Sequence, residues 1–243
     1  MAQAQAGRSS KSNPVRSESS QANHPGNPGK AQRNGKADKS KQPGGLVQAL
    51  ESQGHKFHFI NGRLNAECEP ELQGIVPPPF YSHYPRDVNP GTDLGAAIQY
   101  TLRTMDREGP FDAVMGFSQG AALAYSLLEH HVQTKGPDAE PLFKVAVFIC
   151  AGTPYELDGG GPVEVDSLRE VNGVREYRVR IPTAHIVGRQ DRLYEQGLKL
   201  FGLCEPGNAE VYDHGGKHMI PFDAGSNDAM VGIIERAIGR VKK

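Results

Sequence analysis

Short apolar runs recur along most of the chain, separated by longer polar or mixed segments. Runs rich in β-branched and aromatic residues, and too short for a helix, are typical of buried strands. The predicted strands are residues 56–60, 111–115, 143–150, 182–187 and 210–212. The Asn61-Gly62 pair, a strong turn signal, closes the first of them.

Segments with apolar residues at helical spacing accompany these runs. The clearest one places four apolar residues on one face, with Thr92 or Asp93 as the expected cap and an end near Arg107. Further helices are predicted at residues 46–50, 121–128, 193–203 and 228–238. Strands that alternate with helices predict an α/β fold, in which a mostly parallel sheet is covered by helices on both faces.

Two segments do not follow this alternation. Residues 63–90 form a long connection dense in proline and aromatic residues, and a loop of that length inside a domain is usually functional. Residues 1–43 are polar and contain eight Lys or Arg but only two acids. We expect them to be a disordered basic tail, because they have too little apolar surface to offset the entropy of ordering. Residues 44–243 are then the folded domain.

Composition excludes several classes of protein. The 27 basic and 28 acidic residues nearly balance, so no nucleic-acid partner is expected, although the tail leaves a weak case for one. Neither a secretory signal nor a membrane-spanning stretch is evident. The three cysteines, Cys68, Cys150 and Cys204, have no C-x-x-C spacing. This argues against a disulfide framework or a zinc site and indicates a reducing, cytoplasmic location.

The most informative motif is G-x-S-x-G at residues 116–120, between a predicted strand and a predicted helix. This context is that of a nucleophile elbow, which presents the Ser118 hydroxyl on a sharp turn. Gly116 and Gly120 are expected to let the strand and helix approach closely. The backbone N–H of Gln119, at the start of the helix, is the expected donor to an oxyanion.

A serine hydroxyl needs a base and an orienting acid to become a nucleophile, and elbow hydrolases supply them later in the chain. Asp191 follows the strand at 182–187, and His218 lies in a glycine-rich loop after the strand at 210–212. We therefore predict a Ser118–His218–Asp191 triad. The alternatives that remain are His214 or His185 as the base, Asp213 as the acid, Asp191 as a mere helix cap, and His218 as an ordinary loop residue.

Four blocks of the sequence resemble the fungal serine hydrolase family of α/β-hydrolases. They are GPFDAVMGFSQGAALA, FKVAVFICAG, IPTAHIVGRQDRLYEQG and VYDHGGKHMIP, and the resemblance covers about residues 46–238. It implies hydrolysis of an ester or thioester by Ser118, His218 and Asp191, without metal or cofactor. The segment FHFING resembles the second core strand of that family.

Two further segments, IVPPPFYSHYP and DRLYEQGLKLFGLC, resemble stand-alone esterases and thioesterases of fungal polyketide gene clusters. That subgroup implies release of an acyl chain from a carrier thioester, with a polyketide synthase as a partner. A general short-chain carboxylesterase is the first alternative. We expect the substrate to lie under residues 63–90.

The sequence departs from the family before residue 46. Members of the family begin with an apolar strand and a His-Gly loop that supplies a second oxyanion N–H, whereas the polar tail occupies that position here. We therefore expect a sheet without its first core strand and only the Gln119 donor. Loss of one such donor costs about a hundred- to a thousand-fold in rate. The second alternative is thus an impaired remnant that acts by binding only.

Overall fold

A computed structural model describes residues 45–68, 78–86 and 88–241. The predicted tail at residues 1–43 and part of the 63–90 connection lie outside these residues.

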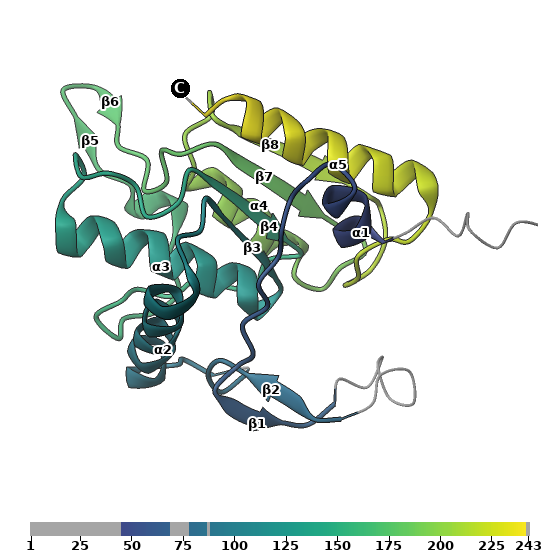
Figure 1. The fold of residues 1–243 in the computed structure, drawn as a ribbon. Helices are drawn as coiled ribbons and strands as arrows, with labels where there is room; N and C mark the ends of the chain where they lie inside the picture. Colours follow the sequence, from purple (N-terminus) through teal and green to yellow (C-terminus); the bar gives the residue numbers. More distant parts are fainter. Residues whose placement is uncertain (1–44, 69–77, 87, 242–243) are drawn as a thin grey trace, which may run out of the picture. The chain divides into compact units, whose positions relative to one another are not determined.

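A four-stranded parallel sheet forms the centre of the described chain (Figure 1). Its strands are β3 (Ala113–Phe117), β4 (Val145–Ile149), β7 (Thr183–Val187) and β8 (Ala209–Asp213), side by side in that order. Four of the five predicted strands are therefore confirmed. Because all four are parallel, their carboxyl ends, with Ser118, Cys150, Gly188 and His214 immediately beyond them, meet at one edge of the sheet.

Helices cover both faces of this sheet, as the alternating pattern predicts (Figure 1). On one face α3 (Gln119–Lys135) and α4 (Tyr194–Gly202) pack on Ala146 and Phe148 of β4. On the other, α1 (Leu46–Glu51) and α5 (Ala224–Gly239) pack on the alternate β4 residues. Every residue of β4 and β7 is buried, which explains why β4 reads as a continuous apolar run and why β7 is mostly apolar, with Thr183 and His185 as its polar residues.

The helix boundaries correct the sequence prediction in two places. Helix α2 (Thr92–Glu108) packs on α3 through the predicted face, but its N-cap is Gly91 and neither Thr92 nor Asp93 caps it. Helix α5 begins four residues before the predicted Asp228, because the Asp223 side chain accepts a hydrogen bond from Ser226 N and caps it. That aspartate is a capping signal that the sequence analysis missed.

The predicted strand at residues 56–60 was wrong. No strand is assigned there, since a strand needs a neighbour with which to exchange backbone hydrogen bonds, and the segment has none among the described residues. Phe57 packs instead against the core under α5, whereas Phe59, whose ring centroid is 6.2 Å from that of Phe57, is 73% exposed. Within the described chain β3 pairs with β4 alone, and the expectation of a missing first core strand concerns residues that lie outside the described ones.

Two small hairpins were not predicted. Within the 63–90 connection, β1 (Leu64–Ala66) pairs antiparallel with β2 (Phe80–Ser82). After the short 3-10 turn η2 (Val165–Ser167), β5 (Glu170–Val171) pairs with β6 (Val174–Arg175). Asn172 and Gly173 between them both have positive φ, so this Asn-Gly pair was a readable hairpin signal.

No helix in the described residues is long and apolar enough to cross a bilayer.

Candidate active site

Ser118 occupies a strained turn between β3 and α3. Its φ is 54° and its ψ is −119°, a left-handed conformation that is rare for a residue with a side chain. Backbone hydrogen bonds hold the turn: Ser118 N donates to Ile149 O, and Gly152 N donates to Ser118 O. The sharp strand–turn–helix geometry predicted from the motif is therefore present.

The two motif glycines do not play equal parts. A Cβ on Gly116 would lie 2.3 Å from Gly120 O and 2.4 Å from Ala121 N, so β3 and α3 can approach only with glycine there. A Cβ on Gly120 would meet nothing within 4 Å. The predicted steric role is thus correct for Gly116 and wrong for Gly120.

These contacts predict opposite effects of two matched substitutions. Gly116→Ala should lower the free energy of unfolding by about 3 kcal/mol or more, because backbone atoms at the clash cannot move aside. Gly120→Ala, within a helix and in open space, should raise it by about 0.5–1 kcal/mol. Urea unfolding of both variants measures the difference. Equal destabilisation by the two would contradict the close approach at Gly116.

The side chains of Ser118, His218 and Asp191 lie in one hydrogen-bonded row. His218 Nε2 is 3.0 Å from Ser118 Oγ, and His218 Nδ1 is 2.8 Å from Asp191 Oδ2. The Asp191 side chain is 1% exposed, whereas that of His218 is 25% exposed. A buried carboxylate, an imidazole and an accessible hydroxyl in this order can pass a proton from the hydroxyl to the ring.

Two hydrogen bonds join the loops that carry Asp191 and His218. Gln190 N donates to Gly216 O at 3.0 Å, and Gln190 Nε2 donates to Gly215 O at 2.9 Å. Gly188 allows this contact, since a Cβ there would lie 2.4 Å from Gly216 O. Asp191 Oδ1 also accepts a hydrogen bond from Leu193 N, so it stabilises the following turn as well.

The rival residues lie elsewhere in the same region. Asp213 accepts hydrogen bonds from Arg189 N and Gly215 N, which joins the ends of β7 and β8. His214 accepts a hydrogen bond from Gly216 N at Nδ1, and its Nε2 is 3.7 Å from Cys150 Sγ. Neither side chain is hydrogen-bonded to Ser118 in the described structure.

His185 is a core residue. It is 1% exposed, and its ring lies 5.0 Å from that of Phe148 and 5.1 Å from that of Phe201. Burial lowers the pKa of His185 to about 3.

This depressed pKa predicts acid destabilisation. Between pH 6.5 and about 3 the unfolded chain binds a proton at His185 that the folded chain does not, so stability falls as pH falls. The slope for one proton is about 1.4 kcal/mol per pH unit. A His185→Leu variant should lose that part of the slope between pH 6 and pH 4 in urea unfolding, while other groups contribute equally to both proteins. An identical slope would show that His185 is not buried neutral.

The side chain of Gln119 forms hydrogen bonds to the segment that follows β2. Its side-chain Oε1 accepts hydrogen bonds from His83 N at 2.9 Å and Ser82 Oγ at 3.0 Å, and its Nε2 donates to Tyr84 O at 2.8 Å. The segment after β2 is thereby attached to the elbow. No hydrogen bond among the described residues uses the Gln119 N–H, which leaves it available to a ligand.

Removal of this attachment should loosen the segment locally. Gln119→Ala leaves His83 N without its side-chain partner and Tyr84 O with one of its two donors, Ser82 Oγ, a loss of about 2 kcal/mol. Hydrogen exchange of the His83 amide should therefore accelerate about 30-fold. Ser82→Ala, which removes the contacts of Ser82 Oγ with Tyr84 O and Gln119 Oε1 but keeps the bond from His83 N to Gln119 Oε1, serves as the control and should change the rate much less. Unchanged exchange in Gln119→Ala would contradict the attachment.

Sequence reasoning also missed Cys150, which follows β4 with a φ of 44°. Its thiol shares the site with Asp191 and His218, and one ligand atom from each of the three lies within 4.8 Å of the others. Among the described residues this is a group that could hold a metal ion. No spacing signal could have revealed it, because the three residues come from different connections.

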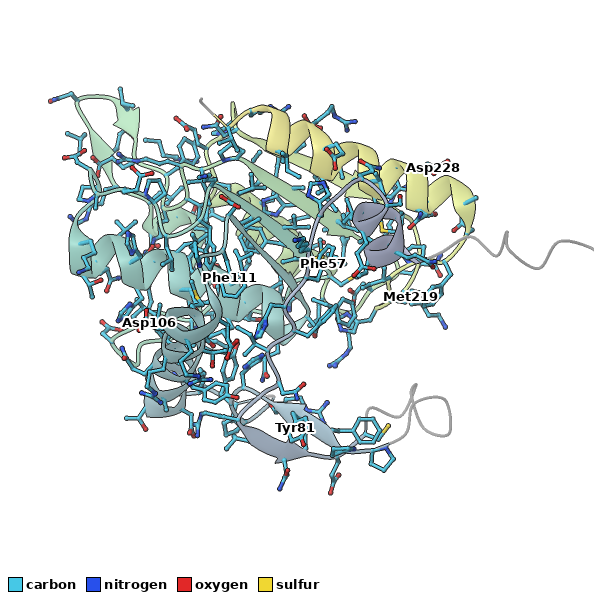
Figure 2. All side chains as sticks on the ribbon, viewed as in Figure 1. Phe57, Tyr81, Asp106, Phe111, Met219 and Asp228 are labelled. Carbon is cyan, nitrogen blue, oxygen red and sulfur yellow. The ribbon has the colours of Figure 1, made fainter. Side chains whose placement is uncertain are left out.

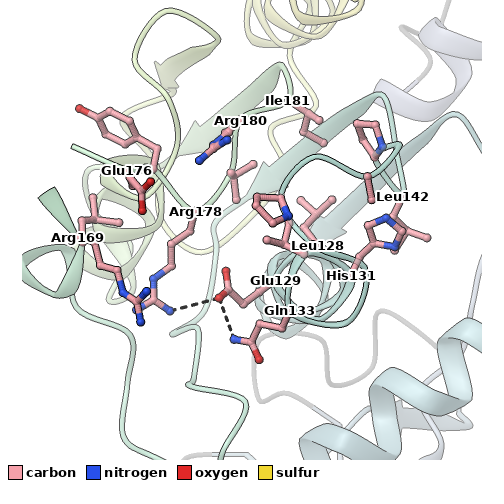
Figure 3. A pocket seen from close by; sticks show the side chains of 18 of the residues that line it. Leu128, Glu129, His131, Gln133, Leu142, Arg169, Glu176, Arg178, Arg180 and Ile181 are labelled. Carbon is pink, nitrogen blue, oxygen red and sulfur yellow. Dashed lines mark hydrogen bonds and ion pairs between the residues drawn. The ribbon is translucent and has the colours of Figure 1, made fainter. Parts of the chain in front are cut away.

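One cavity among the described residues is separate from this site. It measures about 560 Å³ and is lined by the carboxyl half of α3 and by residues around Arg178 (Figure 3). Arg178 donates to both carboxylate oxygens of Glu156 at 2.9 Å and lies 3.6 Å from Glu129. Ser118 precedes the opposite end of α3, about 15–20 Å away along the helix. The cavity is therefore not where a substrate of Ser118 would bind.

Comparisons with known proteins agree with this architecture. The family model described as Serine hydrolase (FSH1) matches residues 33–230. Esterase FPY3 of Fusarium mangiferae is 31% identical over 178 residues, which cover 72% of this chain and 77% of that protein. Hydrolase phiM of Talaromyces stipitatus is 26% identical over 196 residues, 74% of each chain. A solved carboxylesterase of Bacillus cereus superposes with a TM-score of 0.41 at 18% identity, covering 63% of this chain and 68% of its own.

The family match spans most of the chain and includes all the elements that carry Ser118, Asp191 and His218. The parallel sheet with helices on both faces is that of an α/β-hydrolase. The chain belongs to the serine hydrolase (FSH1) family.

Proposed function

We propose that the protein hydrolyses an acyl ester or thioester through a covalent acyl-serine, with Ser118 as nucleophile, His218 as base and Asp191 as the orienting acid. The observation that carries the proposal is the hydrogen-bonded row, 3.0 Å from His218 Nε2 to Ser118 Oγ and 2.8 Å from His218 Nδ1 to Asp191 Oδ2. In the first step His218 Nε2 takes the Ser118 proton while Oγ attacks the carbonyl carbon. The imidazolium then returns the proton to the departing alcohol or thiol.

The acyl-serine is released by the reverse sequence. A water molecule gives its proton to His218 Nε2 as its oxygen attacks the acyl carbon, and the proton returns to Ser118 Oγ as the acid leaves. In both steps the free Gln119 N–H at the start of α3 is placed to donate to the tetrahedral oxyanion, and the helix dipole favours that negative charge. The proton transfers require no metal or cofactor.

The surroundings of Ser118 favour an apolar acyl chain. The Phe117 ring is 4.8 Å from the His218 ring and 38% exposed. Met219 and Phe222, on the loop that Met219 marks in Figure 2, are 43% and 71% exposed. Burial of such side chains by an acyl group contributes about 25 cal/mol per Å² of apolar area. The β1–β2 hairpin, marked by Tyr81 in Figure 2 and attached through Gln119, is the proposed substrate-side element.

Within this class we favour release of a polyketide acyl chain from a carrier-protein thioester in the cytoplasm. The support is the resemblance of residues 75–85 and 191–204 to stand-alone esterases and thioesterases of fungal polyketide gene clusters. Simple short-chain esters are the alternative substrates, and binding without hydrolysis is the alternative activity.

A fluorophosphonate probe tests the proposal directly, because it labels only an activated serine. The protein should be labelled, and Ser118→Ala should not be. Folded protein that resists labelling would favour the binding-only alternative. With labelling established, the same acyl group offered as a carrier-protein thioester and as a nitrophenyl ester separates the substrates. A higher kcat/KM for the thioester supports acyl-chain release, and the reverse order supports a general carboxylesterase.

A further inference from the structure

Three potential metal ligands meet where the parallel strands end. Cys150 follows β4, Asp191 lies beyond β7 and His218 lies beyond β8, and one ligand atom of each falls within 4.8 Å of the others. As whole residues, Cys150 is 2% exposed and Asp191 is 6% exposed, so neither is a chance surface ligand. The lack of a C-x-x-C spacing argues against a zinc motif made by neighbouring residues. It does not apply to this cluster, because the three residues come from distant parts of the chain.

We propose that Cys150 Sγ, Asp191 Oδ2 and His218 Nδ1 bind a thiophilic divalent cation such as Zn²⁺, and that the bound cation inhibits hydrolysis. The binding site stands on geometry alone. Only the inhibition rests on the proposed function of Ser118, His218 and Asp191.

The donor set and its spacing suit zinc. A thiolate, an imidazole and a carboxylate are its usual ligands, at about 2.0–2.3 Å from the ion. In a tetrahedral site such ligands lie about 3.3–3.6 Å from one another. Asp191 Oδ2 and His218 Nδ1 are 2.8 Å apart, and no pair in the cluster exceeds 4.8 Å. Side-chain adjustments of about 1 Å therefore close the site, with a fourth position left for water.

The neighbouring hydrogen bonds suit a bound cation as well. With Nδ1 on the metal, His218 Nε2 carries the proton and can donate to Ser118 Oγ, 3.0 Å away. His214 Nδ1 accepts from Gly216 N, which places the proton of the neutral ring on Nε2. That Nε2 is 3.7 Å from Cys150 Sγ and can donate to a thiolate. Metal sites characteristically orient their ligands through such outer contacts.

Charge explains why a cation is stabilised there. The buried Asp191 carboxylate lies beside the Cys150 thiol and the His218 ring. A divalent cation replaces the thiol proton, which goes to solvent, and neutralises both anions. The 25% exposure of the His218 side chain provides an approach from solvent.

The bound cation would prevent catalysis by occupying the proton relay. Asp191 Oδ2 would ligate the metal and no longer accept from Nδ1–H. His218 Nε2 would carry a proton and could not accept the one on Ser118 Oγ. The cation is thus an inhibitor in this proposal.

Cobalt spectroscopy tests the site independently of activity. Co²⁺ added to the wild-type protein and to Ser118→Ala should produce a sulfur-to-cobalt charge-transfer band in the near ultraviolet. Cys150→Ser should lack it. Cys204→Ser is the matched control: Cys204 is also buried, but its thiol donates to Leu200 O of α4. Absence of the band from wild-type and Ser118→Ala protein overturns the proposal, whether or not Cys150→Ser folds.

Zn²⁺ inhibition provides the second arm, with each variant compared with its own metal-free rate. Wild type and Cys204→Ser should be inhibited equally, and Cys150→Ser should require about 10–100 times more Zn²⁺, since a lost ligand costs at least as much as a lost outer contact. Equal inhibition of Cys150→Ser and wild type overturns the inhibitory role. A protein without esterase activity that still gives the cobalt band separates failure of the proposed function from failure of this inference.

Discussion

Replacement of His218 by alanine is expected to reduce kcat for ester hydrolysis roughly a million-fold, the loss typical when a serine hydrolase loses its base. The reason is geometric: His218 Nε2 is 3.0 Å from Ser118 Oγ, and no other imidazole in the described structure is hydrogen-bonded to that hydroxyl. Steady-state rates of ester hydrolysis, with folding checked by circular dichroism, measure the effect.

His214→Gln is the matched control for this prediction. His214 lies four residues earlier in the same loop and contacts Gly216 N and Cys150 Sγ rather than Ser118. Its replacement removes about one hydrogen bond, worth about 1 kcal/mol, and should lower kcat no more than about fivefold. If His214→Gln were the inactive variant and His218→Ala the active one, the assignment of the base would be wrong.

Asp191→Asn should lower kcat by about ten thousand-fold while the fold persists. The Asp191 carboxylate accepts from His218 Nδ1 at 2.8 Å, which keeps the lone pair on Nε2 facing Ser118. An amide can donate to Nδ1 instead and so favours the wrong tautomer. The expected readout is a fall in kcat with little change in KM.

The paired control is Asp213→Asn. Asp213 binds Arg189 and the Gly215 N–H, so its loss should appear mainly as lower stability, with kcat of the folded protein changed by less than about tenfold. Urea unfolding and rate measurements on both aspartate variants separate the roles. A larger kcat loss in Asp213→Asn than in Asp191→Asn would transfer the acid role to Asp213.

The sequence predicted the central sheet and its helices because burial on both faces leaves an unmistakable pattern. The strand around Val147 is a continuous apolar run, the strand around Ala184 is mostly apolar, and a glycine follows each of them. Asp191 and His218 could be singled out because parallel strands end at a common edge. The predicted catalytic roles themselves stay predictions until rates are measured.

What the sequence could not supply depends on contacts between distant segments. Phe57 packs against the core without a paired strand and Phe59 stays exposed, so the aromatic pattern predicted a strand that is not assigned there. The Gln119 side chain binds a segment more than 30 residues away in the chain. Cys150 meets Asp191 only after β4 and β7 have paired. None of these contacts leaves a local periodic signal.

The hydrogen bonds between the loops around Gly188 and Gly216 affect how the free energy of substrate binding contributes to catalysis. With Gln190 anchored to Gly215 and Gly216, the imidazole is preorganised before any ligand arrives. If the base were mobile, substrate binding would have to order it, and the entropic cost would reduce the affinity for the acyl chain. Because the base is already ordered here, the binding free energy of the acyl chain can lower the activation free energy of hydrolysis. Lengthening the acyl chain should therefore raise kcat/KM until the apolar surface beside Phe117 is covered.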